Sequence, residues 1–291
     1  MMVNPIKKSV LITGASGFIG RHLTKKITNH VLPTDKNGEK VDLRVREKVL
    51  ELRKVDVVIH LAGKIPSKQN FSKNVFFDHN VKGTLNILEY CVKKKIKKLI
   101  FVSSYVYGKP KYNPIDEKHI LQPHNTYTKS KFLAEELCKS YGKKFGIDVI
   151  ILRPFNIFGN SQKNGFLVSN IIKSMNDKKQ ITILNKKNKR DYLFIDDLVD
   201  AIIKMIDYES KFEIFNVGSG ECHTFEELIR IFEIKSGRKL KMKIQTSKIN
   251  NIPKIQADIT KIKKKTGWYP KYNFEDGIEK ILMKTGLLAE K

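Results

Sequence analysis

The stretch Ser9-Val-Leu-Ile-Thr-Gly-Ala-Ser-Gly-Phe-Ile-Gly20 joins a short β-branched run to the start of an amphipathic segment. Gly14 permits a tight turn, Gly17 lets the backbone approach a pyrophosphate, and Gly20 lets a helix pack closely on a strand. The alternative is a glycine-rich turn without a ligand. Because a strand precedes the glycines and a helix comes after them, the stretch predicts a dinucleotide bound at a helix N-terminus.

A carboxylate stands where the ribose of such a dinucleotide is expected. Asp35 follows the predicted strand Val31 to Thr34 and lies about 20 residues after Gly14, which is the usual spacing for a group that binds the ribose hydroxyls. A carboxylate there repels a 2′-phosphate, so NAD is favoured over NADP, although Lys36 is able to pair with that phosphate. An ordinary turn residue is the alternative for Asp35.

Short β-branched runs alternate with amphipathic stretches in the first half of the chain, which is typical of parallel βαβ units. The expected strands are Ser9 to Thr13, Val31 to Thr34, Val41 to Leu43, Val55 to Ala62, Leu99 to Ser104 and Asp148 to Arg153. The expected helices are Arg21 to Thr28, Arg46 to Arg53, Val75 to Lys95 and Tyr127 to Phe145. The predicted fold class is therefore α/β, with a Rossmann doubly wound parallel sheet in residues 1–155 and returning segments near 191–220.

After Pro154 the pattern is less regular. We expect a helix at Phe166 to Asp177, a strand at Ile181 to Leu184, an extended run at Asp191 to Ile195, a helix at Asp196 to Tyr208 and a strand at Glu213 to Val217. Thr224 and Glu227 have the spacing of a capping box at the start of another helix. Residues 156–291 are thus expected to form mainly a smaller α/β domain that binds the substrate.

The 291 residues carry a net charge of +26, and 41% of them are hydrophobic, as in a globular protein. Such a charge suits nucleic acid, an acidic membrane surface or phosphorylated substrates. The excess is mostly scattered Lys, without an aromatic-rich basic motif, which favours solvated faces. We therefore expect no nucleic-acid partner and no membrane partner, and a Rossmann-fold RNA-binding protein is the remote alternative.

The three cysteines, Cys91, Cys138 and Cys222, are widely spaced and odd in number. They predict neither a disulfide framework nor a metal site, and they favour a reducing cytoplasm. The N-terminal stretch lacks the apolar core of a signal peptide, and no run approaches the ~20 apolar residues of a membrane span. The predicted location is cytoplasmic.

Tyr127 and Lys131 lie four residues apart in a predicted helix, so their side chains share one face. A phenol with a pKa of about 10 is a poor base at neutral pH, but an adjacent ammonium group favours the phenolate. Such a pair is able to move protons near neutral pH. The alternative is two surface residues on a Lys-rich helix.

These features together resemble the extended short-chain dehydrogenase/reductase family, specifically its NAD-dependent nucleotide-sugar epimerase and dehydratase branch. The resemblance covers nearly the whole chain. It rests, in order, on Thr13-Gly-Ala-Ser-Gly-Phe-Ile-Gly20, His60-Leu-Ala-Gly63, Asn80-Val-Lys-Gly-Thr84, Ser103-Ser-Tyr-Val-Tyr-Gly108, Tyr127 to Lys131, Leu152-Arg-Pro-Phe-Asn156, Arg190-Asp-Tyr192 and Gly267-Trp-Tyr-Pro270. It implies two domains, a nucleotide-sugar substrate and a homodimer.

The resemblance assigns the catalytic roles to Ser103, Tyr127 and Lys131. Tyr127 takes the proton, Lys131 holds the nicotinamide ribose and stabilises the phenolate, and Ser103 hydrogen-bonds the reacting sugar oxygen. Strand alternation directs the neighbouring Ser104 to the opposite face. For both serines the alternative is a strand-end hydroxyl that satisfies loop backbone.

The resemblance also implies the binding residues. For NAD they are Gly14, Ser16, Gly17, Phe18, Ile19, Gly20, Asp35, Asp42, Leu43, Leu61, Ala62, Gly63, Asn80, Tyr127, Lys131, Pro154 and Phe155. Packing in the core without a ligand is the alternative for Leu61, Ala62, Pro154 and Phe155. For the nucleotide sugar they are Ser103, Ser104, Asn156, Arg190 and Lys248. Lys248 is a possible stand-in for an Arg-Pro-Gly-Asp turn that many family members carry, and a salt bridge to Asp191 or Asp196 is the alternative for Arg190.

The two residues after Ser103 narrow the reaction. Dehydratases of this branch need an acidic pair directly after the catalytic Thr, whereas this chain has Ser104 and Tyr105, so dehydration is disfavoured. A 4-epimerase and a 4-ketoreductase would use the same residues. Asp35 favours NAD and hence 4-epimerisation of a UDP-hexose, with an NAD(P)H-dependent nucleotide-4-keto-sugar reductase as the alternative. The sequence does not identify the nucleotide or the sugar.

Overall fold

The computed structural model describes residues 7–34, 37–66, 73–163, 165–177, 179–246 and 251–289. The chain forms two compact units. The first contains Met1–Gly108, Ile120–Arg153 and Val199–Phe215, and the second contains Lys109–His119, Pro154–Leu198 and Asn216–Lys291. The returning segment of the first unit is therefore shorter than the expected 191–220, and residues 109–119 belong with the second unit.

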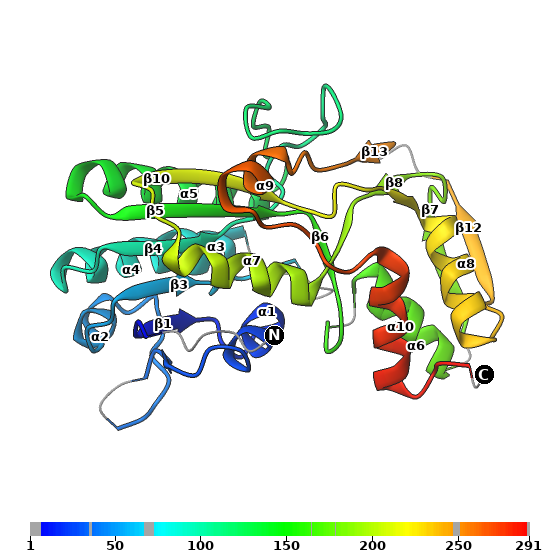
Figure 1. Ribbon diagram of the computed structural model, residues 1–291, viewed down its shortest axis with the longest axis horizontal. Coiled ribbons are helices and arrows are strands. Elements are labelled where there is room, and N and C mark those ends of the chain that lie inside the picture. The colour runs from blue at the N-terminus through cyan, green and yellow to red at the C-terminus, as the bar shows by residue number, and fades with distance from the viewer. Residues whose placement is uncertain are drawn as a thin grey trace. The chain divides into compact units, whose positions relative to one another are not determined.

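A six-stranded sheet forms the first unit, in the order β10-β5-β4-β3-β1-β2 (Figure 1). Its strands are β1 (Val10–Thr13), β2 (His30–Val31), β3 (Val57–His60), β4 (Lys98–Val102), β5 (Asp148–Pro154) and β10 (Phe212–Val217). The pairs β1–β2, β1–β3, β3–β4 and β4–β5 are parallel. The predicted Rossmann sheet is confirmed, and parallel pairing brings the carboxyl ends of these strands to one edge.

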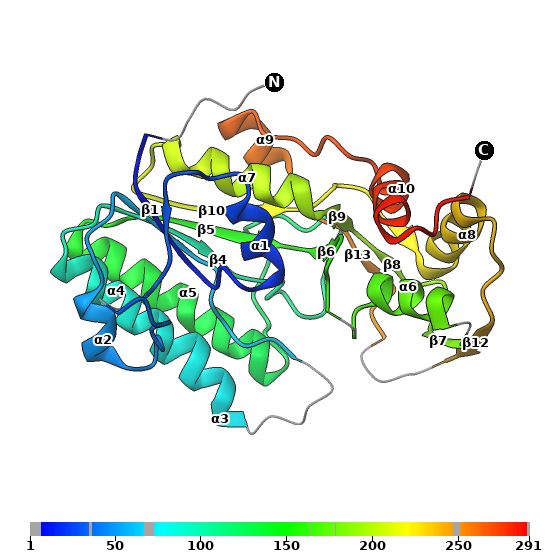
Figure 2. The same ribbon diagram turned by 90° about the horizontal axis from the view of Figure 1, so that it is seen from below.

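Helices cover both faces of this sheet, with α2, α4 and α5 on one face and α1 and α7 on the other (Figure 2). Their bounds are α1 (Phe18–Thr24), α2 (Arg46–Glu51), α3 (Lys73–Phe76), α4 (Gly83–Lys93), α5 (Thr126–Phe145) and α7 (Ile195–Asp207). A π-helical turn, η1 (Phe77–Lys82), joins α3 to α4. The long helix expected from Val75 to Lys95 is thus interrupted by a turn of different hydrogen bonding.

The predicted strand at Val41 to Leu43 is wrong. The isolated bridge of Thr34 with Lys40 ends before Val41, and residues 41–45 include a turn that leads into α2. Val41 is nonetheless buried, and its N–H donates to the Pro33 carbonyl over 2.8 Å. The apolar pattern that suggested a strand therefore marks burial in the core without a strand partner.

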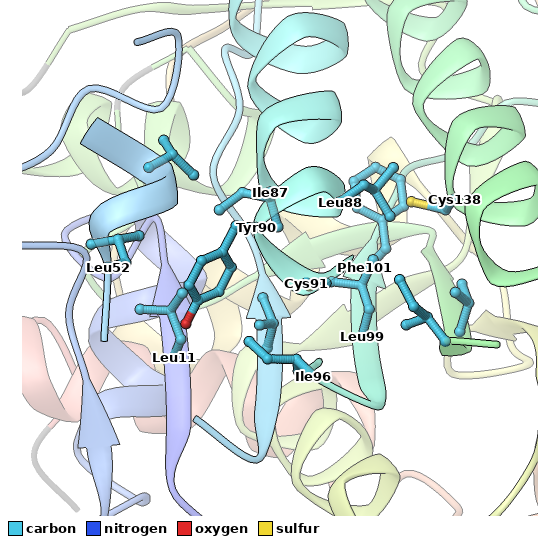
Figure 3. Packing of buried hydrophobic residues seen from close by; sticks show 14 of the residues in the cluster. Leu11, Leu52, Ile87, Leu88, Tyr90, Cys91, Ile96, Leu99, Phe101 and Cys138 are labelled. Carbon is cyan, nitrogen blue, oxygen red and sulfur yellow. The ribbon is translucent and has the colours of Figure 1, made fainter. Parts of the chain in front are cut away.

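The core on the α4 side of the sheet consists of aliphatic and aromatic side chains from strands and helices (Figure 3). Leu11 of β1 and Leu99 of β4 share this cluster with Ile87, Leu88 and Tyr90 of α4, and Leu11 lies beside the Tyr90 ring. Cys138 contributes from α5, and both it and Cys91 are free thiols in this cluster. Burial raises the pKa of the Cys91 thiol to about 12, so this sulfur packs as an apolar group.

The second unit is built from short strands and amphipathic helices. Its strands are β6 (Asn156–Phe158), β7 (Ile181–Leu184), β8 (Lys189–Arg190), β9 (Tyr192–Phe194), β11 (His223–Thr224), β12 (Met242–Gln245) and β13 (Lys254–Ile255). Its helices are α6 (Leu167–Asp177), α8 (Phe225–Ser236), α9 (Thr260–Thr266) and α10 (Phe274–Thr285). The strands pair as β11-β8-β13, β12-β7 and β6-β9. This unit is α/β, as expected of the smaller part of the chain, and its role in binding a substrate stays a prediction.

Local capping sequences fix two helix starts. The predicted capping box of α8 is confirmed, with Glu227 N–H donating to Thr224 Oγ1 over 3.0 Å. Asn125 caps α5 in the same way by accepting from Thr128 N–H over 2.8 Å. The α5 cap lies directly before Tyr127 and so satisfies a free N–H group in the helical turn that carries this residue. Among the described helices, none is long and apolar enough to cross a membrane.

Candidate active site

The glycine-rich turn after β1 has the geometry of a phosphate cradle. Gly14 has a φ of +72°, and a Cβ there would lie 2.7 Å from Ala62 N. Gly17 N–H donates to the Gly14 carbonyl over 2.9 Å, and Gly17 caps α1 without any side-chain hydrogen bond. A Cβ on Gly20 would overlap the Gly14 carbonyl. The three glycines therefore add no side chain to the turn, which also contains Ser16 and is followed by Phe18 and Ile19, and such a turn fits a pyrophosphate.

The adenosine side of the predicted site is partly described. Asp35 and its neighbour Lys36 lie outside the described residues, so the preference for NAD that rests on Asp35 stays a prediction. Asp42 accepts three hydrogen bonds from the Arg44 side chain, at 2.6 to 3.1 Å, and one from Arg44 N–H. These bonds hold the pKa of Asp42 at about 2, so the carboxylate is ionised. The neighbouring Leu43 is half-buried.

The loop after β3 closes the other side of the glycine turn. Leu61 N–H donates to the Thr13 carbonyl over 3.2 Å, and Ala62 N–H donates to Thr13 Oγ1 over 3.2 Å. Leu61 and Ala62 are half-buried and Gly63 is exposed. The predicted residues of this loop therefore lie beside the glycine turn.

The two serines lie at the carboxyl end of β4, next to Tyr127 of α5. The Ser104 side chain lies close enough to the Tyr127 phenol to lower its pKa, whereas Ser103 Oγ is buried without a partner among the described residues. The expectation that Ser104 faces away is wrong because β4 ends at Val102, so strand alternation no longer applies to either serine. A buried hydroxyl without a partner costs free energy, which a ligand would restore by bonding to it.

Lys131 lies one turn after Tyr127 and is buried. Its Nζ donates to the Val102 carbonyl over 2.8 Å and lies 4.2 Å from the centre of the Phe101 ring. Burial lowers the pKa of Lys131 to about 8, so at neutral pH the ammonium form predominates. The spacing on one helix face therefore places Lys131 beneath the end of β4.

The expectation that Lys131 lowers the pKa of Tyr127 is wrong for the chain by itself. Burial raises the pKa of the Tyr127 phenol, and the hydrogen bond from Ser104 lowers it by less. The ammonium group of Lys131 is engaged with the Val102 carbonyl. A proton acceptor at Tyr127 therefore requires a further positive charge near the phenol.

Asn80 is buried within the π-helical turn η1. Its amide accepts from Lys64 N–H over 2.6 Å and donates to the Lys64 carbonyl and to Ser130 Oγ over 3.0 and 2.9 Å. Ser130 Oγ in turn donates to the Tyr127 carbonyl over 2.7 Å. The predicted residue thus connects the loop after β3 to α5. The π-helical geometry itself had no signal in the sequence, because residue spacing does not distinguish one such turn from an α-helix.

The predicted substrate residues of the second unit lie around β8 and β9. Asn156 Nδ2 donates to the Asp191 carbonyl over 2.9 Å. Arg190 Nη1 donates to the carbonyls of Lys189 and Ile252 over 2.9 and 2.8 Å. Lys248 lies outside the described residues. Asn156 and Arg190 are therefore brought together by the strand pairings on either side of Asp191.

The role of Asp191 itself was not predicted from the sequence. Its carboxylate accepts four hydrogen bonds over 2.7 to 3.1 Å, from Ser219 N–H and Oγ–H, Gly220 N–H and Ala257 N–H. We call Asp191 and these three donor residues the Asp191 cluster. Burial raises the pKa of Asp191 to about 6, against the lowering effect of these bonds. The carboxylate considered as an ion-pair partner of Arg190 joins two loops instead. No local sequence pattern indicates this, because the donors come from distant segments.

Pro154 and Phe155 begin the second unit at the end of β5. Both are buried, and Phe155 N–H donates to the Val217 carbonyl over 3.0 Å. Among the described residues, no group of three or more His, Cys, Asp or Glu side chains is arranged to hold a metal ion.

A Rossmann sheet with a glycine cradle at one edge, and a Tyr and a Lys one helical turn apart beside it, defines a dinucleotide-dependent enzyme. The chain belongs to the NAD dependent epimerase/dehydratase family, whose model matches residues 10–218. Enzymes of this family use NAD in sugar metabolism, which agrees with the resemblance in the sequence motifs.

Similar proteins cover several reactions. The chain is 30% identical to a putative UDP-glucose 4-epimerase from Methanocaldococcus jannaschii, over 94% of this chain and 97% of that one. It is 30% identical to a dTDP-4-dehydro-6-deoxyglucose reductase from Escherichia coli, over 95% and 97% of the two chains. The structure resembles RMD from Pseudomonas aeruginosa in complex with NADPH, with a TM-score of 0.87, 26% identity and coverage of 96% and 99%.

Proposed function

We propose that this protein is an NAD-dependent nucleotide-sugar 4-epimerase that converts a UDP-hexose through a transient 4-keto sugar, with Tyr127 as acid and base. The observation that carries the proposal is the buried, unpartnered hydroxyl of Ser103, next to Ser104 and the Tyr127 phenol, among the residues that the structure describes. A substrate hydroxyl placed there would complete the hydrogen bonding of Ser103 and meet the phenol at the same time.

The proposed chemistry is a balanced oxidation and reduction. The Tyr127 oxygen takes the proton of the sugar 4-hydroxyl while the hydrogen on C4 leaves as hydride, which makes the 4-keto sugar. The same hydride returns to the other face of C4, and Tyr127 returns the proton. Bound NAD would supply the hydride acceptor and a positive charge. With NAD bound, its positive charge and that of Lys131 would together favour the phenolate.

Dehydration fits the chain less well. The two positions after Ser103 hold a hydroxyl and a phenol, and Tyr105 Oη donates to the Gly108 carbonyl over 2.7 Å. Loss of water from the sugar needs a carboxylic acid that protonates the leaving hydroxyl. A redox cycle at C4 needs only the proton acceptor and the hydride acceptor.

The second unit is proposed to bind the nucleotide diphosphate. Arg190 carries a fork of donors that suits two neighbouring phosphates, and the Ile252 carbonyl holds its guanidinium in a fixed direction. Asn156 is anchored beside it through the Asp191 carbonyl. Lys248 is proposed as a further phosphate ligand in place of the Arg-Pro-Gly-Asp turn.

The proposal is tested by incubating the purified protein with UDP-glucose, UDP-galactose and their N-acetyl and uronic acid forms, without added reductant. Interconversion of C4 epimers, followed by NMR, is expected for at least one pair. Mass spectrometry of the denatured protein should detect NAD that was retained during purification. Absence of conversion with every sugar, in a protein that retains NAD, would contradict the proposal.

The second candidate is an NAD(P)H-dependent nucleotide-4-keto-sugar reductase. It is supported by the similarity to the Escherichia coli reductase and by the NADPH complex of the Pseudomonas aeruginosa structure. This activity would consume added NADPH or NADH with a 4-keto sugar nucleotide, whereas the epimerase needs no added reductant. Comparing the two assays on one preparation separates the candidates.

We also propose that the protein forms the homodimer implied by the resemblance and that it is cytoplasmic. Light scattering on the purified protein should give twice the mass of one chain.

No nucleic-acid partner is proposed. A polynucleotide is expected to bind only weakly and to dissociate as salt increases, because the positive charge is carried by scattered Lys residues. A tight RNA complex at moderate salt, without sugar chemistry, would favour the RNA-binding alternative.

A further inference from the structure

His60 ends β3 and is completely buried, and both of its ring nitrogens have hydroxyl partners. Thr13 Oγ1, from the end of β1, lies 2.6 Å from Nδ1. Thr84 Oγ1, from the first turn of α4, lies 3.0 Å from Nε2. The ring therefore bridges the strand that leads into the glycine turn and the helix that comes after the π-helical turn η1.

The outer partners of the two threonines fix the direction of each hydrogen bond. Thr84 Oγ1 donates its only proton to the Asn80 carbonyl over 2.5 Å, so it accepts from His60 Nε2–H. At the other end, Thr13 Oγ1 accepts from Ala62 N–H over 3.2 Å and is able to donate its proton to His60 Nδ1. The bonds run in one sense from Ala62 to Asn80, and we call this chain of groups the His60 relay.

The His60 relay ends on the residue that holds the Tyr127 turn in place. The Asn80 side chain accepts from Lys64 N–H and donates to the Lys64 carbonyl, and it also donates to Ser130 Oγ. Ser130 Oγ donates to the Tyr127 carbonyl over 2.7 Å. A change in the η1 turn would therefore shift Asn80 and Ser130, which hold the Tyr127 backbone, without a direct contact to the phenol.

We propose that His60 is a positioning residue, a neutral ring held in the Nε2–H form, that joins the glycine turn to the η1 turn and so fixes Asn80 and Tyr127. The part that concerns Tyr127 rests on the proposed function, whereas the protonation state of the ring does not. A neutral ring is required because a second proton, on Nδ1, would face the Thr13 hydroxyl proton and turn it away.

The surroundings of the ring favour the neutral form. Phe101 stacks on His60 with ring centres 5.7 Å apart. The Nζ of Lys131 lies 4.2 Å from the centre of the same Phe101 ring. Burial, and secondarily the charge of Lys131, lower the pKa of His60 to about 3. The ring therefore stays neutral throughout the range in which the enzyme would work.

The protonation state is tested by ¹⁵N NMR of the labelled protein without substrate. The chain has 7 His residues, and the signals of His60 are those absent from H60Q, or those that move in T84V if H60Q does not fold. The expected spectrum has a proton on Nε2 and none on Nδ1, and the signals do not shift between mildly acidic and mildly basic pH. A proton on Nδ1, or a ring that titrates in this range, would overturn the proposal.

The positioning role is tested by T84V, T84S and Y90F. T84V removes the acceptor of His60 Nε2–H while T84S keeps it, and Y90F removes a different buried hydroxyl of α4, which donates to the Arg53 carbonyl over 2.6 Å. We expect T84V to lower kcat about tenfold, which corresponds to one lost hydrogen bond. Its KM for the sugar should change little, and the midpoint of its kcat–pH profile should move.

The control variants decide between positioning and general destabilisation. T84S is expected to restore both kcat and the pH profile, and Y90F is expected to lower the thermal midpoint with neither kinetic change. Equal kinetic losses in T84V and Y90F would overturn the positioning role. If the wild-type protein converts no sugar nucleotide, the proposed function fails, and the NMR spectrum still decides the protonation state of His60.

Discussion

The Asp191 cluster of the second unit and the Tyr127 site of the first, which consists of Ser103, Ser104, Tyr127 and Lys131, are both built from buried polar groups. They differ in how completely these groups are paired. The Asp191 carboxylate accepts four hydrogen bonds, whereas Ser103 Oγ has no partner among the described residues. A fully paired group holds loops together, and an unpaired one is kept for a ligand.

The largest effect is expected from Y127F, which separates chemistry from structure in the Tyr127 site. Removal of a general acid and base typically lowers kcat by about 10²- to 10⁴-fold. The variant should keep its fold and retain NAD, because only the hydroxyl is lost while the ring keeps its contact with Phe76. Sugar conversion and retained NAD are measured on the same preparation.

The matched control is Y105F, which removes a phenol hydroxyl that donates to the Gly108 carbonyl. Y105F should keep most of the sugar conversion. If Y127F converted sugars as well as Y105F does, Tyr127 would not be the acid and base, and the pairing difference between the two regions would lose its functional meaning.

The opposite test is D191A, which removes the carboxylate that accepts all four hydrogen bonds of the Asp191 cluster. The variant leaves the N–H groups of Ser219, Gly220 and Ala257 without their acceptor, at about 1 to 3 kcal/mol each before water enters. Removing a buried charge offsets part of this cost. We expect a net loss of about 3 kcal/mol in the free energy of unfolding, measured by urea denaturation.

Asp258 provides the control in the same unit, because its carboxylate accepts from Thr260 N–H alone among the bonds described for it. D258A should lose about 1 kcal/mol or less. An equal loss in D191A and D258A would show that the Asp191 cluster does not hold the two loops together.

The two regions also explain how far the sequence could predict the protein. The glycine turn, the parallel sheet and the Tyr127 helix were predicted because each depends on a local pattern: glycine spacing, alternation of strands and helices, or residues one turn apart. The Asp191 cluster, the η1 turn and the partner of Ser104 were not predicted, because each depends on contacts between distant segments. Val41 shows the same limit, since an apolar run indicates burial and not the presence of a strand partner.

A pH experiment compares the buried charges themselves. Burial lowers the pKa of Lys131 to about 8 in the folded chain. Above that pH, Lys131 is therefore deprotonated in the folded chain while it is still protonated in the unfolded chain. The unfolded state then binds more protons, and the free energy of unfolding rises with pH. Between about pH 8 and pH 10, Lys131 should contribute a rise of up to about 2 kcal/mol.

K131M should lack this rise, because a Met has no proton to lose. The measurement is urea denaturation of the two proteins, without NAD, across this pH range. Subtracting the K131M curve removes the titration of the other lysines and tyrosines. Parallel curves for the two proteins would mean that burial does not lower the pKa of Lys131.

Asp191 should show the opposite pH dependence. Because burial raises the pKa of this acid, the free energy of unfolding should rise as pH falls below about 6.

The smallest effect on stability, and the sharpest test of the comparison, is expected from S103A. Most substitutions of buried polar groups destabilise a protein, but Ser103 Oγ has no hydrogen bond to lose among the described residues. Its removal should leave the free energy of unfolding unchanged or raise it by up to about 1 kcal/mol, while sugar conversion falls about tenfold. S104A should instead weaken the support of the Tyr127 hydroxyl. If S103A lost stability and kept its activity, the unpaired hydroxyl would belong to the fold, and Ser104 would become the better candidate for binding the sugar.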